Sequence, residues 1–74
     1  MTCATKFEYA KVIADRALEI SIGKPPLVKV ADHVGPIDVA KMEWDARVIP
    51  IVVRRVMPDG SVIEIKASEM WFSD

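Results

Sequence analysis

Residues 49–65 read Ile49-Pro50-Ile51-Val52-Val53-Arg54-Arg55-Val56-Met57-Pro58-Asp59-Gly60-Ser61-Val62-Ile63-Glu64-Ile65. The two β-branched runs favour strands, and Pro58-Asp59-Gly60 between them fits a type I turn closed by a bulge. Along the first run, one face carries Ile49, Ile51, Val53 and Arg55, and the other carries Val52, Arg54 and Val56. Both faces are mostly apolar, whereas a hairpin with one face in water would alternate apolar with polar residues. The stretch therefore predicts an antiparallel hairpin that packs one face on the chain's own helices and needs a partner for the other.

Two helices are expected before the hairpin. The first starts at a capping box, Thr5 with Glu8, and ends at Gly23 followed by Pro25-Pro26. Its apolar stripe is built largely from small side chains that would let another backbone come close: Ala10, Ile13, Ala14, Ala17, Leu18 and Ser21. A second helix is expected from about Pro36 to Ala46, with Ile37, Ala40 and Trp44 on one side. After the hairpin, the tail is expected to form one helical turn with Ser68 as a candidate cap. The sequence thus predicts a small single α+β domain over residues 1–74, two helices packed with a C-terminal antiparallel β-hairpin.

The size of the chain predicts association. At 8.2 kDa, folding removes about 7,000 Å² from water, which contributes on the order of 110 kcal/mol if about 60% of it is apolar. Ordering 74 residues at about 1.5 kcal/mol each costs a similar ~110 kcal/mol. Cys3 has no second cysteine to pair with, and no Cys/His cluster suggests a structural metal. Binding to another protein is the remaining stabiliser, and no cofactor or metal is expected.

Charge and hydropathy exclude several classes of protein. Ten Lys and Arg against eleven Asp and Glu argue against the uniformly basic surface of a nucleic-acid module, although a local basic patch is allowed. The chain opens without a secretion signal and contains no run near the ~18 apolar residues that span a bilayer. We therefore expect a soluble cytoplasmic protein with a reduced thiol and no membrane contact.

Few side chains suggest chemistry of their own. Asp32 beside His33 could form a general base with its orienting carboxylate, but no nucleophile with a matching partner accompanies them, and a solvated loop histidine is the simpler interpretation. Lys11, Asp15 and Glu19 form a charged row that fits a solvated helix face. Trp44, Trp71 and Phe72 are more typical of core than of a ligand platform.

Three arginines fit an interface better than an active site. Arg16 adjoins the small-residue stripe, where its guanidinium could fork onto a partner's carboxylate. Arg54 and Arg55 leave opposite faces of the strand. They either shield the sheet with their stems or contact another subunit or nucleic-acid backbone, and the sequence leaves both alternatives open.

Several blocks of the chain, taken together, carry a family resemblance. Residues 5–13, 16–23, 36–40, 49–55 and 58–61 are similar to subunit K of archaeal RNA polymerase, the counterpart of the sixth common subunit of the eukaryotic polymerases and of bacterial omega. The similarity runs from Thr5 to about Glu69. Two blocks are specific when taken together, Arg16-Ala17-Leu18 and the stretch from Ile-Pro-Ile-x-x-Arg-Arg to Pro-Asp-Gly-Ser at 49–61. The hairpin block favours the archaeal and eukaryotic branch over bacterial omega, and without the long acidic N-terminal tail of eukaryotic members the archaeal type is expected. Glu19 departs from the family's usual glutamine.

The resemblance implies a non-catalytic subunit that clamps the largest polymerase subunit and aids its folding, assembly and stability. It would meet DNA or RNA only indirectly, through the complex, and would have no small-molecule substrate. The partner interface that the resemblance implies comprises Thr5, Lys6, Phe7, Glu8, Arg16, Ala17, Leu18, Ile20, Ile49, Pro50, Arg54 and Arg55. On this basis Ala17→Arg is expected to weaken binding to the largest subunit while the isolated domain stays folded.

Two other functions compete with this interpretation. A free-standing nucleic-acid-binding or transcription-regulatory module would use Arg54, Arg55 and Lys66, and its affinity would fall steeply with salt. A small enzyme would be centred on Asp32 and His33, although no convergent set of groups supports it.

Overall fold

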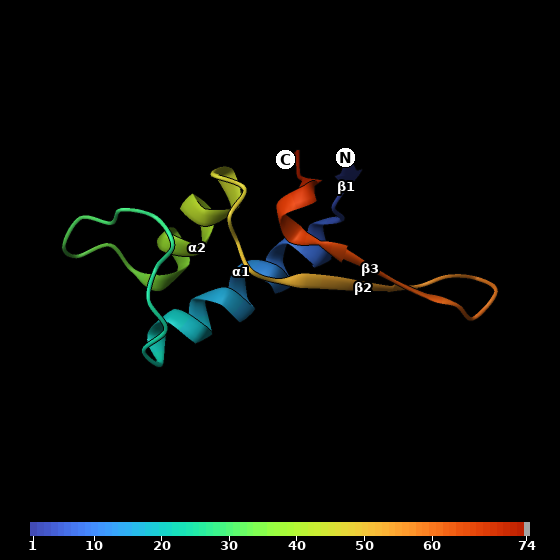
Figure 1. Ribbon diagram of the computed structural model, residues 1–74, viewed down its shortest axis with the longest axis horizontal. Helices are drawn as coiled ribbons and strands as arrows, with labels where there is room; N and C mark the ends of the chain where they lie inside the picture. The colour runs from blue at the N-terminus through green and yellow to red at the C-terminus, as the bar shows by residue number, and fades with distance from the viewer. Residues whose placement is uncertain (74) are drawn as a thin grey trace.

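The predicted hairpin is present in the computed structural model, which describes residues 1–73. Strands β2 (Val52–Val56) and β3 (Val62–Lys66) run antiparallel and pair Val53 with Ile65. The Gly60 N–H donates to the Met57 carbonyl at 2.9 Å, and Gly60 itself has a φ of 88°. This geometry confirms the type I turn closed by a bulge. The hairpin projects from the rest of the molecule along its 46 Å long axis (Figure 1).

Both helices form within a residue or two of their predicted bounds. Helix α1 (Lys6–Ser21) begins at the expected capping box, in which the Glu8 N–H donates to Thr5 Oγ1 at 3.0 Å and the Thr5 N–H donates to Glu8 Oε1 at 2.9 Å. It ends where Gly23 adopts a φ of 110°. Helix α2 (Pro36–Asp45) has Pro36 in its first turn, as predicted.

The two chain ends meet in a strand pair that the sequence did not indicate. Strand β1 (Thr2–Cys3) runs parallel to β4 (Met70–Trp71), and the Ala4 N–H donates to the Trp71 carbonyl at 2.7 Å. Figure 1 shows the termini side by side at one edge of the molecule. Strands of two residues are too short to show an alternating pattern, which is why sequence reasoning missed them.

The predicted turn in the tail is the 3₁₀ turn η1 (Ala67–Glu69), which lies between β3 and β4. Its N-cap is Lys66 and no side chain caps it, so the assignment of Ser68 as the cap was wrong. The turn begins two residues earlier than a Ser68 cap requires. It is held instead through the backbone, because the Ala67 N–H donates to the Ile51 carbonyl at 2.8 Å.

The core lies where α1, α2 and the inner face of β2 meet. Its buried residues are Ala4, Val12, Ile13, Ala17, Ala40, Trp44, Ile49, Val53, Ala67 and Met70. Tyr9 closes one side of it, with its ring edge-on to Trp44 at 4.9 Å and stacked on Phe72 at 4.3 Å between centroids. Trp44 is thus a core residue as predicted, and Phe72 is half-buried and packs against the core, whereas Trp71 is 43% exposed.

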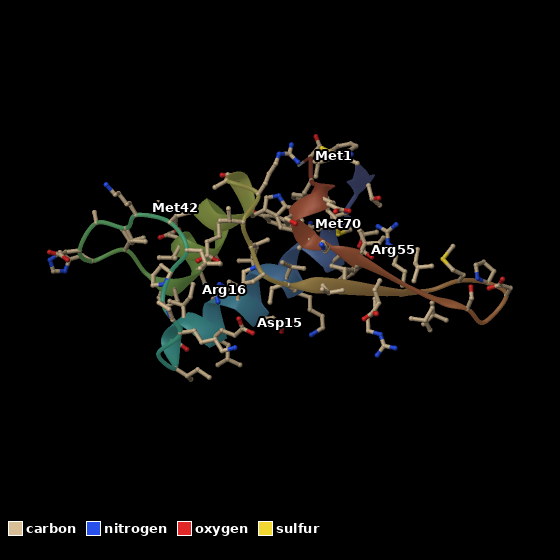
Figure 2. All side chains as sticks on the ribbon, viewed as in Figure 1. Met1, Asp15, Arg16, Met42, Arg55 and Met70 are labelled. Carbon is tan, nitrogen blue, oxygen red and sulfur yellow. The ribbon has the colours of Figure 1, made fainter. Side chains whose placement is uncertain are left out.

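A buried ion pair joins the two helices. Arg16 on α1 is 3% exposed and Glu43 on α2 is 0% exposed, and the guanidinium meets both carboxylate oxygens, from Nε to Oε1 at 2.6 Å and from Nη2 to Oε2 at 3.1 Å. In Figure 2 Arg16 lies between the helices, and its neighbour Asp15 points away from them. The fork expected of Arg16 is therefore formed, but its acceptor is a carboxylate of the same chain rather than a partner's.

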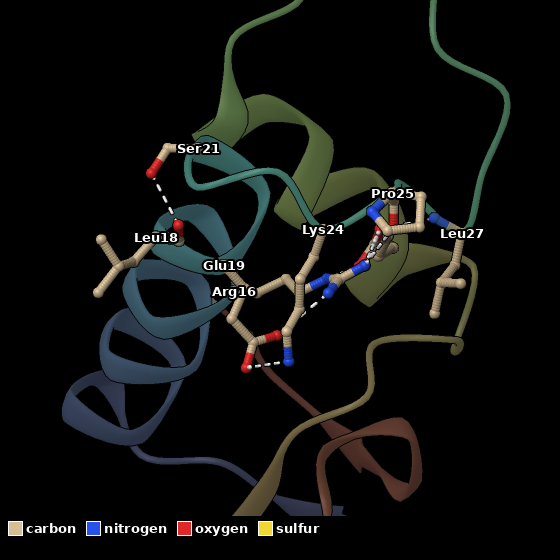
Figure 3. A network of polar contacts seen from close by, with 8 residues as sticks. Arg16, Leu18, Glu19, Ser21, Lys24, Pro25 and Leu27 are labelled. Carbon is tan, nitrogen blue, oxygen red and sulfur yellow. Dashed lines mark hydrogen bonds and ion pairs between the residues drawn. The ribbon is translucent and has the colours of Figure 1, made fainter.

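The same pair organises the loop between the helices (Figure 3). Arg16 Nη2 also donates to the Pro25 carbonyl at 3.0 Å, and the Leu27 N–H donates to Glu43 Oε2 at 2.9 Å. Arg16 Nη1 also donates to Glu19 Oε1 at 3.1 Å. Glu19, which stands where the resembling family usually has glutamine, thus accepts a hydrogen bond through its carboxylate. Hydrogen bonding to Glu43 raises the pKa of the Arg16 guanidinium further above its ordinary value.

Removing one member of the pair is expected to be costly. Glu43→Ala strands a buried guanidinium and should lower the free energy of unfolding by about 3–5 kcal/mol, enough to unfold much of this small chain without denaturant. Arg16→Met combined with Glu43→Leu should retain more stability, because no charge is left buried. Urea unfolding followed by circular dichroism measures both.

The matched control is Asp15→Ala, which breaks the exposed pair between Lys11 Nζ and Asp15 at 3.1 Å. It should cost less than about 1 kcal/mol. Equal losses for Glu43→Ala and Asp15→Ala would contradict the importance given to the buried pair.

Candidate protein-docking surface

The chain exposes more surface than a compact protein of its mass. Its accessible area is 5228 Å², against about 4,500 Å² expected for 8.2 kDa. The molecule is elongated, with extents of 46 × 24 × 17 Å. Large apolar side chains are exposed on α1, at Phe7 and Leu18, and on the hairpin, at Val52 and Val56. Exposed apolar surface of this kind is typical of a protein that binds another protein.

One side of α1 presents large apolar side chains to solvent. Phe7 is 87% exposed and Leu18 is 62% exposed, and the exposed alanines Ala10 and Ala14 lie between them at helical spacing. These four residues form what we call the outer face of α1. In Figure 3 Leu18 points away from the polar network around Arg16. Because residues 1–73 leave these four side chains exposed, the outer face is available to a partner.

The sequence-predicted interface residues on α1 divide between this face and the core. Lys6, Phe7 and Leu18 are exposed, and Ile20 is half-buried. Ala17 is only 8% exposed and belongs to the core. The expectation that Ala17→Arg leaves the domain folded was therefore wrong, because an arginine there would disrupt the packing of α1 within its own chain.

A groove lies between the outer face of α1 and the start of α2. It encloses about 370 Å³ and is lined by Lys6, Tyr9, Ala10, Ile13, Ala14, Ile37, Lys41 and Phe72. We call it the α1–α2 groove. Ile37 was expected to share one side of α2 with Ala40 and Trp44. Those two residues are buried, whereas Ile37 is 56% exposed and lines the groove.

A second groove runs along the segment that leads into β2. It encloses about 330 Å³ and is lined by Arg47, Val48, Ile49, Pro50, Ile51, Val52, Lys66 and Ser68. Of the two predicted interface residues here, Ile49 is buried and Pro50 is exposed. Both residues belong to the groove, but Pro50 is the one a partner could reach.

The two arginines of β2 have different surroundings. Arg55, on the inner face, donates from Nε and Nη2 to the two oxygens of Glu8 at 2.6 Å each, and from Nη2 to the Cys3 carbonyl at 2.8 Å. It ties the hairpin to the start of α1 and to β1, and Figure 2 shows it on the side of the hairpin that carries the chain ends. Arg54 is exposed on the outer face, opposite Glu64.

The ion pair with Arg55 shifts the pKa of the Glu8 carboxyl. Hydrogen bonds from Arg55, aided by those from Thr5, outweigh the effect of partial burial and lower the pKa of Glu8 to about 2. The carboxylate thus has two roles, as the N3 residue of the capping box and as the anchor of the hairpin. Thr5 and Glu8 act within the chain and position the outer face beside them.

The residues of the two competing functions are not brought together. Arg54 and Lys66 lie on the outer face of the hairpin with Glu64 between them, whereas Arg55 is held by Glu8 on the inner face. Asp32 and His33 are exposed in the loop before α2. Within residues 1–73, no three His, Cys, Asp or Glu side chains are grouped to hold a metal ion, and no helix is both long and apolar enough to cross a membrane.

Sequence reasoning missed Glu43, although a signal was present. The buried positions of α1 are Val12, Ile13, Arg16 and Ala17, and those of α2 are Val39, Ala40, Glu43 and Trp44. The two sets have the same spacing, with opposite charges at the corresponding third position. A charged residue in each of two apolar stripes indicates a buried pair between the helices.

Comparison with known proteins shows one consistent set of relatives. No family model matches the chain. It is 39% identical over 70 residues to a probable RPABC2 subunit of DNA-directed RNA polymerases I, II and III from Caenorhabditis elegans, a match that covers 95% of this chain and 51% of the nematode protein. It is 42% identical over 62 residues to DNA-directed RNA polymerase subunit Rpo6 of Thermofilum pendens, covering 82% of this chain and 76% of that protein.

The Rpo6 subunit of Methanothermobacter thermautotrophicus is 45% identical over 51 residues, which cover 69% of this chain and 84% of the relative. The chain therefore spans about half the length of the eukaryotic relatives and most of the length of the archaeal ones.

The ion pair between Glu8 and Arg55 predicts that the stability of the fold depends on pH. Because the folded-state pKa of Glu8, about 2, lies below its ordinary value of 4.5, its stabilisation is complete above about pH 5 and is lost as the pH falls toward 2. Glu8→Gln should therefore lower the melting temperature at neutral pH and flatten its decline in acid. Thermal unfolding between pH 7 and 2 measures both profiles.

Glu69→Gln removes an exposed carboxylate in η1 and serves as the control. It should follow the wild-type profile. If Glu8→Gln also followed the wild-type profile, the ion pair between Glu8 and Arg55 would not contribute to stability.

Proposed function

Because the chain belongs to the Rpo6 and RPABC2 family of DNA-directed RNA polymerase subunits, we propose that it is a non-catalytic subunit that clamps the largest polymerase subunit and promotes its folding, assembly and stability in transcription. Membership of the family confirms the resemblance to archaeal subunit K. The single observation that carries the proposal is the similarity to archaeal Rpo6 subunits over most of both chains. The complex would act in the cytoplasm, and this chain would meet DNA and RNA only through it.

The surface of the chain supports a clamping role. Apolar side chains are exposed on the outer face of α1, at Phe7 and Leu18, and on the outer face of the hairpin, where Val52 is 51% and Val56 is 76% exposed. These faces lie on different elements of an elongated molecule (Figure 1). A partner that covered both would be held at separated points, which is what clamping requires.

The predicted interface residues take two kinds of role in this proposal. Direct contacts come from the exposed side chains, Lys6, Phe7, Leu18, Pro50 and Arg54, with Ile20 at the margin. The others position these side chains: Thr5, Glu8 and Arg55 join the hairpin to α1, and Arg16, Ala17 and Ile49 hold α1 against the rest of the domain. Binding then adds the stabilisation that so small a core lacks.

Exposed leucines provide a matched test of the proposed surface. Leu18 is 62% exposed on the outer face of α1, and Leu27 is 52% exposed in the loop between the helices, on the opposite side of the polar network in Figure 3. Leu18→Ser should reduce the amount of tagged chain that co-purifies with the large polymerase subunits by roughly tenfold, since a buried leucine contributes about 1.5–3 kcal/mol. Quantitative mass spectrometry of the purified complex measures the ratio.

Leu27→Ser should leave the yield of complex unchanged. Equal yields for the two serine variants would contradict the assignment of the outer face. Purification of the wild-type chain from its native cell without large polymerase subunits would overturn the proposed function itself.

A further inference from the structure

The α1–α2 groove combines an apolar lining with two cationic side chains. Tyr9, Ile13 and Phe72 contribute apolar and aromatic surface, with Ala10 and Ala14 along α1 and Ile37 on α2. Among residues 1–73, the charged side chains that line it are those of Lys6 and Lys41. Such a groove fits a segment that inserts apolar side chains and carries negative charge beside them.

The two lysines differ from other lysines of the helical region. Lys11 pairs with Asp15 at 3.1 Å, and Lys24 lies 3.8 Å from Glu19. Neither Lys6 nor Lys41 has a carboxylate within 4.0 Å among residues 1–73. The groove therefore presents positive charge that the described part of the chain does not balance.

The α1 side of the groove is shaped for a helix. Ala10 and Ala14 are one turn apart and exposed, so a second helix could approach the α1 backbone closely between Phe7 and Leu18. A second copy of this chain would be a poor occupant, because its own α1 carries Lys6 beside Phe7 and would bring like charges together. A nucleic acid would find an apolar lining with only two cations, far from the basic surface that phosphate binding needs.

We propose that the α1–α2 groove binds an acidic amphipathic helix of the polymerase subunit that this chain clamps. Apolar side chains of that helix, three or four residues apart, enter the groove between α1 and Ile37, and its Asp or Glu side chains pair with Lys6 and Lys41. The inference rests on the proposed function, since it assigns the helix to the polymerase partner.

Charge reversal in the assembled polymerase tests the proposal. Tagged wild-type and variant full-length chains are co-expressed in the native cell, and their ratio in the purified polymerase is measured by mass spectrometry. Lys6→Glu with Lys41→Glu should reduce occupancy about tenfold, and Lys6→Met with Lys41→Met should reduce it less, because methionine keeps an apolar stem without charge. Lys24→Glu with Lys29→Glu makes the same change in net charge outside the groove and should compete like the wild type.

Photo-crosslinking identifies the occupant directly. A photoreactive amino acid at position 37, whose native isoleucine is 56% exposed, should crosslink to a segment with acidic residues beside apolar residues three or four apart. Wild-type occupancy for the Lys6→Glu/Lys41→Glu chain, a crosslink to a segment without acidic residues, or no crosslink would overturn the proposal while leaving the proposed function intact. Failure of the wild-type chain itself to enter the polymerase would overturn both. Both lysines are exposed, so circular dichroism should show that both double variants are folded. If the glutamate double variant is unfolded, the occupancy of the methionine double variant decides the question.

Discussion

The buried pair between Arg16 and Glu43 is the constraint on which the helical part of the structure depends. Two full charges removed from water require close opposite charge and satisfied hydrogen bonds, and the guanidinium and carboxylate meet this requirement with each other, with Glu19, and with backbone groups at Pro25 and Leu27. This geometry sets how α2 packs on α1 and where the intervening loop begins. It also determines which side of α1 remains outside.

Two of the arginines stabilise the domain itself and are not part of the surface that remains for a partner. Arg16 and Arg55 both form bidentate ion pairs inside the chain, one between the helices and one between the hairpin and the start of α1. What remains exposed is mainly apolar, with Phe7 and Leu18 on the outer face of α1 and Val52 and Val56 on the hairpin. Arg54 lies between Val52 and Val56 on the hairpin, and Lys6 and Lys41 line the α1–α2 groove beside the outer face of α1. A surface of this kind suits a protein partner with matching negative charge better than it suits nucleic acid.

The domain is also organised to remain elongated. The β1–β4 pair brings the chain ends together, and Arg55 links this pair to the hairpin through the Cys3 carbonyl. The hairpin can therefore extend from the body while its base stays anchored at Glu8. A small chain that spread its apolar surface in this way without a partner would gain less from burial than a compact one, and association compensates for that loss.

Local chemistry along the sequence was enough to predict both helices and the hairpin, although not the β1–β4 pair. The capping box at Thr5 and Glu8, the glycine after α1, Pro36 and the turn at Pro58-Asp59-Gly60 act over a few residues, so their structure follows from neighbours in the chain. Alternation in β2 likewise placed Val53 and Val56 on opposite faces, and the structure shows that Val53 is the buried one. The family resemblance could be recognised from the same residues. Only the tertiary structure decided which charged side chains pair with one another and which small residues are buried. Arg16 pairs with Glu43 and Arg55 pairs with Glu8. Ala17 is buried in the core, whereas Ala14 is exposed. Contacts between residues 27 or 47 positions apart depend on how whole elements pack, and no local pattern specifies that packing.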